Sequence, residues 1–128
     1  MKKGFTLLEL VIVIIVIGIL VAMALPQFVR MAERGRVGKA NVMLDMYRKA
    51  EGIEHAKNAT YSGAMATLQV EIPEITDNDG DWIYTITAAD ASAFVVEASR
   101  IDGPFAGDTI TIDQTGTVGG THPLRPGV

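Results

Sequence analysis

The chain has 128 residues, and 48% of them are hydrophobic. This length allows one small domain once the long apolar segment near the N-terminus is set aside. The formal net charge is −4, and the chain contains no cysteine, which excludes disulfides, thiolate metal sites and cysteine nucleophiles.

The charged residues are unevenly distributed along the chain. Residues 26–68 carry seven basic and four acidic side chains, whereas residues 69–128 carry two basic and ten acidic ones. An acidic C-terminal part lacks the clustered cations that nucleic-acid binding requires, so no nucleic-acid partner is predicted for the chain alone. Two interpretations of the asymmetry stay open: oppositely charged parts of different copies attract each other, or both are ordinary solvated surfaces.

The first predicted element is an apolar helix from Phe5 to Leu25, in which only Thr6 and Glu9 are polar. A helix of these 21 residues is about 31 Å long, enough to cross a bilayer core of about 30 Å. Two lysines precede the helix, so the positive-inside rule predicts a cytoplasmic N-terminus, with the rest of the chain across the membrane.

Three residues distinguish this segment from a simple signal anchor. Glu9 is an ionisable group inside an apolar run, and such a group calls for a partner. Gly18 and Pro26 both weaken a helix, and their freed backbone groups must be satisfied by another source, such as neighbouring helices.

Residues Lys3–Leu10 form the most specific motif of the chain. A short basic leader ends in Gly4, and Phe5, Thr6, two leucines, Glu9 and a further leucine follow. This pattern, with the unbroken apolar run behind it, resembles the processing motif of type IV pilins and of the pseudopilins of type II secretion systems. The resemblance covers residues 1–60 closely and the remainder only in outline.

The resemblance implies that residues 1–4 are a leader. A prepilin peptidase would cut between Gly4 and Phe5, and the new Phe5 amine would be methylated. Residues 5–25 would first span the inner membrane and later form the core of a helical filament of identical subunits. In that core Glu9 would neutralise the amine of a neighbouring Phe5, which agrees with the rule that a buried carboxylate must be paired or protonated.

The resemblance also implies that the helix loosens between Gly18 and Pro26 during assembly. The expected partners are the prepilin peptidase, the assembly machinery of the inner membrane, the membrane itself and further copies of the chain. After assembly the filament would lie outside the cell or in the periplasm.

An amphipathic continuation of the helix is predicted for residues 26–58. The residues predicted to form its apolar face are Phe28, Met31, Val42, Met46, Ala50 and Ile53, with Met43 and Tyr47 beside them. The methionines are predicted to fill a core rather than to bind a metal. A loop is predicted after Asn58, in which Ser62 would cap a short helix that ends at Leu68.

A β-rich head is predicted for residues 59–128. Alternating apolar residues predict strands at Trp82–Thr87, Ala93–Ala98 and Thr109–Ile112. Asp113–Thr117 is the predicted turn after the third strand, and residues 119–128 are predicted to form an extended tail. The predicted fold class is therefore α+β: a long N-terminal helix packed against an antiparallel sheet of about three strands. This fold agrees with the type IV pilin fold that the resemblance implies.

The densest group of candidate metal ligands is an acidic cluster of Asp77, Asp79 and Asp81, and a second acidic loop runs from Asp102 to Asp108. Carboxylate oxygens suit Ca²⁺, but the glycine is misplaced for an EF-hand loop and no glutamate closes it, so a metal-free polar turn is favoured. His55 and His122 lack metal-ligand spacing and are predicted to be ordinary surface residues. No cofactor is predicted, and the chain is not predicted to be an enzyme.

The sequence therefore predicts a structural subunit of a type IV pilus filament. Two alternatives stay open. One is a pseudopilin of a type II secretion system, which would form a periplasmic filament. The other, more distant alternative is a membrane-anchored binding module that does not polymerise.

Overall fold

The computed structural model describes residues 2–127. Its elements are helix α1 (Leu7–Asn58), helix α2 (Met65–Glu71), strands β1 (Trp82–Ala89) and β2 (Phe94–Arg100), the short 3₁₀ helix η1 (Gly103–Phe105), and strands β3 (Thr109–Asp113) and β4 (Val118–Gly119). The predicted α+β class, the long N-terminal helix and its end at Asn58 are confirmed.

The chain divides into two compact units, residues 1–35 and residues 36–128. In the first unit, α1 begins two residues after Phe5 and contains both Gly18 and Pro26. The large apolar side chains of this part of α1 are exposed, from 36% at Val29 to 80% at Leu7. By length and composition, this apolar stretch is sufficient to cross a membrane.

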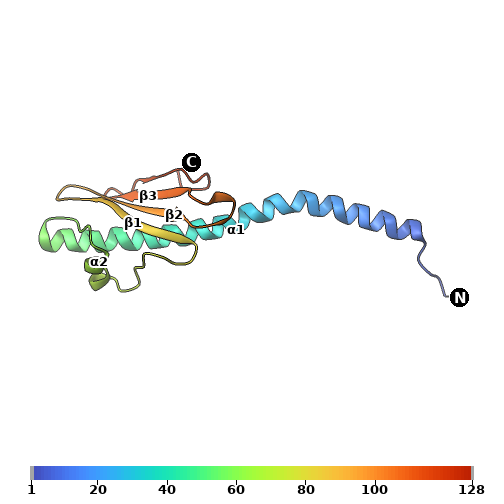
Figure 1. Cartoon of the computed structure of the whole chain (residues 1–128), viewed down its shortest axis with the longest axis horizontal. Coiled ribbons are helices and arrows are strands. Elements are labelled where there is room, and N and C mark those ends of the chain that lie inside the picture. Colours follow the sequence, from blue (N-terminus) through green and yellow to red (C-terminus); the bar gives the residue numbers. More distant parts are fainter. Residues whose placement is uncertain (1, 128) are drawn as a thin grey trace. The chain divides into compact units, whose positions relative to one another are not determined.

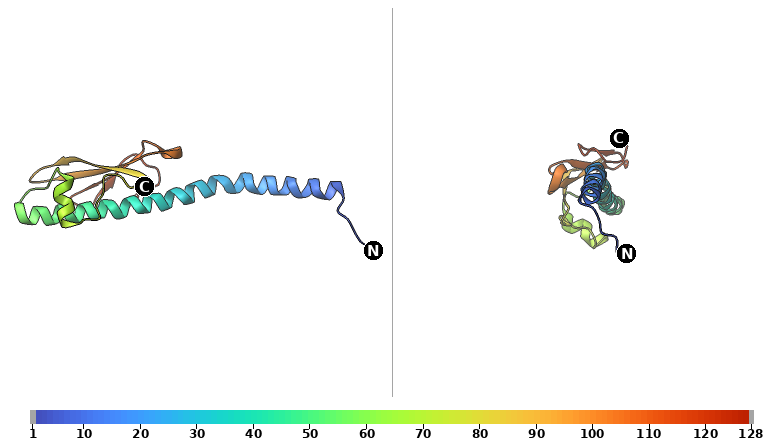
Figure 2. Two further views of the ribbon diagram at one scale, coloured as in Figure 1. Left: turned by 60° about the horizontal axis from the view of Figure 1, so that its bottom comes forward. Right: turned by 90° about the vertical axis from the view of Figure 1, so that its right-hand side faces the viewer.

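The second unit combines the end of α1 with a four-stranded antiparallel sheet. The strand order is β1-β2-β3-β4, so each strand is bonded to the next along the chain. Figures 1 and 2 show this sheet running along one side of the second half of α1, whereas α2 lies on another side. The prediction of about three strands missed β4, because two residues, one of them a glycine, are too short to show an alternating pattern.

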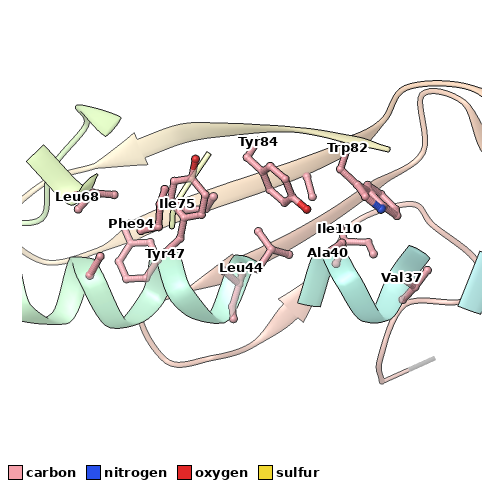
Figure 3. Close-up of a cluster of buried hydrophobic side chains, with 14 residues drawn as sticks. Val37, Ala40, Leu44, Tyr47, Leu68, Ile75, Trp82, Tyr84, Phe94 and Ile110 are labelled. Atoms are coloured by element: carbon pink, nitrogen blue, oxygen red, sulfur yellow. The ribbon is translucent and has the colours of Figure 1, made fainter. Parts of the chain in front are cut away.

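The core of the second unit lies between α1 and the sheet. One face of α1 buries Val37, Ala40, Leu44, Tyr47 and Ala50, which recur every three or four residues. From the sheet, every second residue points to this face, as Figure 3 shows for Tyr84 and Ile110. The remaining buried hydrophobic residues are Leu68, Ile75, Trp82, Phe94, Val96, Ala98 and Ile112.

The predicted apolar face of the second half of α1 was partly wrong. Ala50 and Tyr47 are buried, but Phe28, Met31 and Val42 are exposed, each by more than half. The helix carries apolar residues on more than one side, and the sheet covers the side that contains Val37 and Leu44. The pattern alone does not reveal which side the sheet covers, because small and aromatic residues complete the buried stripe.

The predicted extended tail was also wrong. Val118 and Gly119 pair with β3, and the backbone N–H of His122 donates to the carbonyl of Thr109 at 2.9 Å. Gly120 has a φ of +105°, and a Cβ there would lie 2.2 Å from the Thr109 carbonyl oxygen. Only glycine permits this close approach of the tail to β3.

The predicted cap of the short helix was wrong as well. α2 begins at Met65, and no side chain caps it. The Ser62 hydroxyl accepts a hydrogen bond from the N–H of Ala64 at 3.1 Å, and the Ser62 N–H donates to Glu51 at 2.7 Å. Ser62 therefore fixes the loop to the end of α1 instead of starting α2.

Candidate functional site

The candidate site in the first unit contains Gly4, Phe5 and Glu9. Gly4 and Phe5 precede α1 and are exposed, so the peptide bond between them lies outside regular secondary structure. Glu9 lies in the first turn of α1, where the partial positive charge of the helix N-terminus favours a carboxylate. Together with Lys3, these residues line a hollow of about 270 Å³.

The start of α1 is fixed by Thr6. Its hydroxyl oxygen accepts a hydrogen bond from the backbone N–H of Glu9 at 3.1 Å, and its carbonyl accepts one from Leu10 at 3.2 Å. This is the geometry of a helix N-cap. Thr6 and Glu9 have the spacing of a capping box, so the sequence itself indicates a helix that begins after Thr6. The predicted helix start at Phe5 was therefore two residues too early. The cap leaves Phe5 free of the helix.

The carboxylate of Glu9 has no side-chain partner in the part of the chain that the structure describes. Among residues 2–127, no side chain forms an ion pair or hydrogen bond with it, and its position is exposed. An ionisable group in an apolar segment requires a counterion when water is removed.

Gly18 and Pro26 both lie inside α1, which remains one helix across them. A Cβ at Gly18 would meet no atom within 4 Å, so the local structure of a single chain does not require glycine there. Loosening of this part of the helix on assembly stays a prediction.

The acidic cluster before β1 forms a structured turn. The Asp79 carboxylate accepts hydrogen bonds from the Tyr84 hydroxyl at 2.7 Å and from the backbone N–H of Trp82 at 2.9 Å. Burial alone would raise the pKa of Asp79, but these hydrogen bonds and the charge of Lys39 hold it below its ordinary value. Asp77 contributes its backbone carbonyl, which accepts the N–H of Tyr84 at 2.8 Å.

Cations from α1 already neutralise part of this cluster. The Lys39 ammonium lies 3.0 Å from Asp81 and 3.5 Å from Asp79, and Arg36 lies 3.3 Å from Asp81. The Lys39 hydrogen bond is the main reason why the pKa of Asp81 is lowered. Within residues 2–127, no group of three or more potential ligands is placed to hold a metal ion. Two of the three candidate carboxylates, Asp79 and Asp81, thus lie close to a cation of α1.

These contacts change the interpretation of the charge asymmetry. Arg36 and Lys39 pair with acidic residues of the same unit, and Lys57 pairs with Glu71. These three cations are thus paired within their own unit.

His122 is fully buried, which corrects the prediction of a surface residue. Its ring lies 5.5 Å from Trp82 and 5.1 Å from Phe105, measured between ring centroids, and Nδ1 accepts the N–H of Leu124 at 3.2 Å. His122 is buried because the C-terminal segment packs along β3. This contact joins residues that are distant in sequence, so the local pattern around His122 does not predict it. His55 is half-buried and stacks on Tyr61.

Comparison with known protein families identifies the class of N-terminal segment that this chain carries. The family described as the prokaryotic N-terminal methylation motif matches residues 1–25. These residues contain the capped start of α1, Glu9 in its first turn and the exposed apolar helix. The chain is thus of the class that carries an N-terminal methylation motif ahead of an apolar helix.

Relatives over most of the chain give the family. A fimbrial protein of Pseudomonas aeruginosa is 33% identical over 113 residues, which cover 85% of this chain and 73% of that protein. The type IV major pilin protein PilE of Neisseria gonorrhoeae is 28% identical, with 93% of this chain and 87% of the relative covered. The chain belongs to the type IV pilin family.

The relatives differ in length. The type IV major pilin protein PilA of Myxococcus xanthus is 30% identical over 106 residues, which cover 83% of this chain but only 46% of that protein. The chain spans less than half the length of that relative. The rest of that protein lies outside the alignment.

Proposed function

We propose that this chain is the structural subunit of a type IV pilus filament. One observation carries the proposal: the apolar surface of residues 5–25 is exposed in a single chain, and it includes the Glu9 carboxylate, which has no side-chain partner among residues 2–127. A monomer in water would not tolerate such a surface. The segment must be covered either by lipid or by other protein helices.

A bundle of such helices would cover the apolar surface and would also give the Glu9 carboxylate a partner. Close helix packing replaces lipid contacts, and the Glu9 carboxylate pairs with the Phe5 amine of a neighbouring subunit. The N-cap at Thr6 holds Phe5 outside the helix, so its amine is free to approach a neighbour. Contacts between different surfaces of identical subunits do not close, and they propagate as a fibre.

The proposal includes processing and location. A prepilin peptidase removes residues 1–4, the Phe5 amine is methylated, and the inner-membrane assembly machinery transfers the subunit from the bilayer to the filament. The N-terminus stays cytoplasmic before assembly, and the assembled fibre is extracellular. The matched relatives are named pilins or fimbrial proteins, which favours a pilus over the pseudopilus of a secretion system. An enzymatic role is not proposed, because the matched relatives are structural proteins.

Substitution of Glu9 tests the proposal. Glu9→Ala should lower the yield of sheared filaments at least about tenfold, because an unpaired amine is then buried in the bundle. Membrane insertion and the folding of the second unit should not change. Glu74→Ala removes an exposed carboxylate of the second unit and serves as the matched control.

Mass spectrometry of the filament subunit is the accompanying measurement. The subunit should begin at Phe5 and carry one added methyl group. Normal filaments from Glu9→Ala would contradict the role of this carboxylate, and a subunit that still begins at Met1 would contradict the proposed processing.

A further inference from the structure

Two exposed arginines, Arg30 and Arg34, lie just beyond the apolar segment. Among residues 2–127, neither of their side chains forms an ion pair or a hydrogen bond. By contrast, Arg36 and Lys39 pair with Asp81. The positive charge of Arg30 and Arg34 is therefore available to another molecule.

These arginines are part of a small hollow on one face of α1. Gln27, Arg30, Met31 and Arg34 line a hollow of about 270 Å³. Positions spaced by three and four residues share one helix face, so the amide of Gln27 and both guanidinium groups converge on it. Three hydrogen-bond donors around one hollow suit a phosphate, because guanidinium groups bind phosphate oxygens in a bidentate manner.

The distance from the apolar segment places this hollow at the depth of lipid headgroups. With Leu25 at the edge of the hydrocarbon core, Gln27 lies about 3 Å and Arg30 about 7 Å beyond that edge. The headgroup layer on each side of a bilayer is about 5–7 Å thick. Arg34 lies about 13 Å beyond the edge, but helical side chains lean towards the N-terminus, which here is the direction of the membrane.

The same helix face continues into the apolar segment. Leu20 and Met23 lie seven and four residues before Gln27 and are exposed. Along this face, apolar side chains are thus followed by an amide and then by two cations. This order matches a phospholipid, whose acyl chains lie deeper than its phosphate.

We propose that Gln27, Arg30 and Arg34 form a binding site for the phosphate headgroup of an acidic phospholipid. The acyl chains of the lipid lie against Leu20 and Met23. The inference rests on the proposed membrane insertion before assembly, and it adds a lipid ligand that holds the subunit at a fixed depth. An acidic side chain of a second copy is the competing occupant, but the depth of the site favours lipid while the subunit is in the bilayer.

Lipid selectivity of the full chain in vesicles tests this inference. The protein is reconstituted in phosphatidylcholine, and spin-labelled phosphatidylglycerol is compared with spin-labelled phosphatidylcholine for association with the protein. A cation near an anionic lipid contributes about a fivefold preference, so R30Q/R34Q should lower the preference for phosphatidylglycerol at least about fivefold. R30K/R34K should retain most of it, because lysine also binds phosphate.

The double variant R48Q/K49Q is the matched control. It removes the same formal charge from the second unit and should leave the preference within about twofold of the unchanged chain. An equal loss in this control would show attraction by net charge alone and would overturn the site. An unchanged preference in R30Q/R34Q would also overturn it, and loss of filaments in that variant would then assign the arginines to contacts between copies.

Failure of this inference is distinguishable from failure of the proposed function. Flotation with vesicles and resistance to alkaline extraction report membrane insertion without reference to headgroup charge. An unchanged chain that does not insert would contradict the proposed function and the lipid site together. A chain that inserts but shows no preference for the acidic lipid would overturn only the lipid site.

Discussion

The two halves of α1 differ in what can stabilise them, although they belong to one helix. In the first unit, Leu20 is 60% exposed, and its neighbours are apolar on every side. In the second unit, Leu44 is 1% exposed and lies against the sheet. The second half is stabilised by its own chain, whereas the first half requires lipid or further copies.

This difference shows how one helix serves two purposes. An amphipathic segment folds when one face is buried against a sheet, and its other faces stay polar. A segment that is apolar all round has no preferred face and can be surrounded by lipid or by identical helices. In the proposed filament, Glu9 limits this freedom, because only some helix arrangements supply its carboxylate with a partner.

The largest expected change in the free energy of unfolding comes from a comparison of two leucines, one in each unit. Leu44→Ala should lower the free energy of unfolding of the second unit by about 3 kcal/mol, because it leaves a cavity in the core. Leu20→Ala should change it by less than about 0.5 kcal/mol. Urea unfolding of the detergent-solubilised chain is followed by fluorescence of Trp82, the only tryptophan and a fully buried one. Equal losses of stability in the two variants would contradict the proposed difference between the two halves of α1.

Two glycines provide a second contrast. Gly120→Ala should destabilise the second unit by roughly 2–3 kcal/mol, because alanine disfavours a φ of +105° and its Cβ would clash with the Thr109 carbonyl. Gly18→Ala meets no atom and should leave that unfolding transition unchanged. The same denaturation assay measures both variants, and a stable Gly120→Ala protein would contradict the described path of the tail.

The Asp79 turn should make the stability of the second unit depend on pH in the acid range. Asp79→Ala should cost about 2 kcal/mol at pH 7, because Tyr84 and backbone N–H groups lose their acceptor. The folded-state pKa of Asp79 is lowered, so its stabilisation is present above the ordinary pKa of about 4 and is lost as pH falls through the lower folded value. The gap between Asp79→Ala and the unchanged chain should therefore narrow at acid pH. A gap that is constant from pH 7 to pH 2 would exclude this role.

Glu51 should show the opposite dependence, with a smaller effect. Burial raises the pKa of Glu51, and the nearby Glu54 raises it further, although the N–H of Ser62 opposes the shift. A raised pKa means that stability is fully present below the ordinary value and is lost as pH rises through the folded value. Glu51→Gln removes this loss, so its stability relative to the unchanged chain should increase from pH 4 to pH 8. Glu74→Gln, at an exposed position, is the control and should show no such trend.

The sequence predicted those parts of the fold that depend on local patterns. Alternation of apolar residues located β1, β2 and β3 to within two residues, and loop residues marked the end of α1 at Asn58. The turn after β3 was also predicted, and the Asp113 carboxylate accepts the N–H groups of Thr115 and Thr117 there. The motif at Gly4 and Phe5 indicates the pilin family by its residues alone, because its signal is local.

The features that were missed depend on contacts between distant residues. β4 forms because its two residues pair with the edge of β3. His122 is buried because the C-terminal segment continues along β3 after Gly120. The buried face of α1 is chosen by the sheet, since the helix has more than one apolar stripe. The N-cap at Thr6 differs from these features, because the spacing of Thr6 and Glu9 indicates it locally.

A shortened chain tests the contrast between the two halves most directly. Residues 26–128 retain the second unit and begin at Pro26, which is well suited to the first turn of a helix. We expect this fragment to sediment as a monomer without detergent and to unfold cooperatively at the same urea concentration as the second unit of the full chain. The full chain should require detergent or lipid. A fragment that fails to fold, or a full chain that remains a soluble monomer in water, would contradict the account.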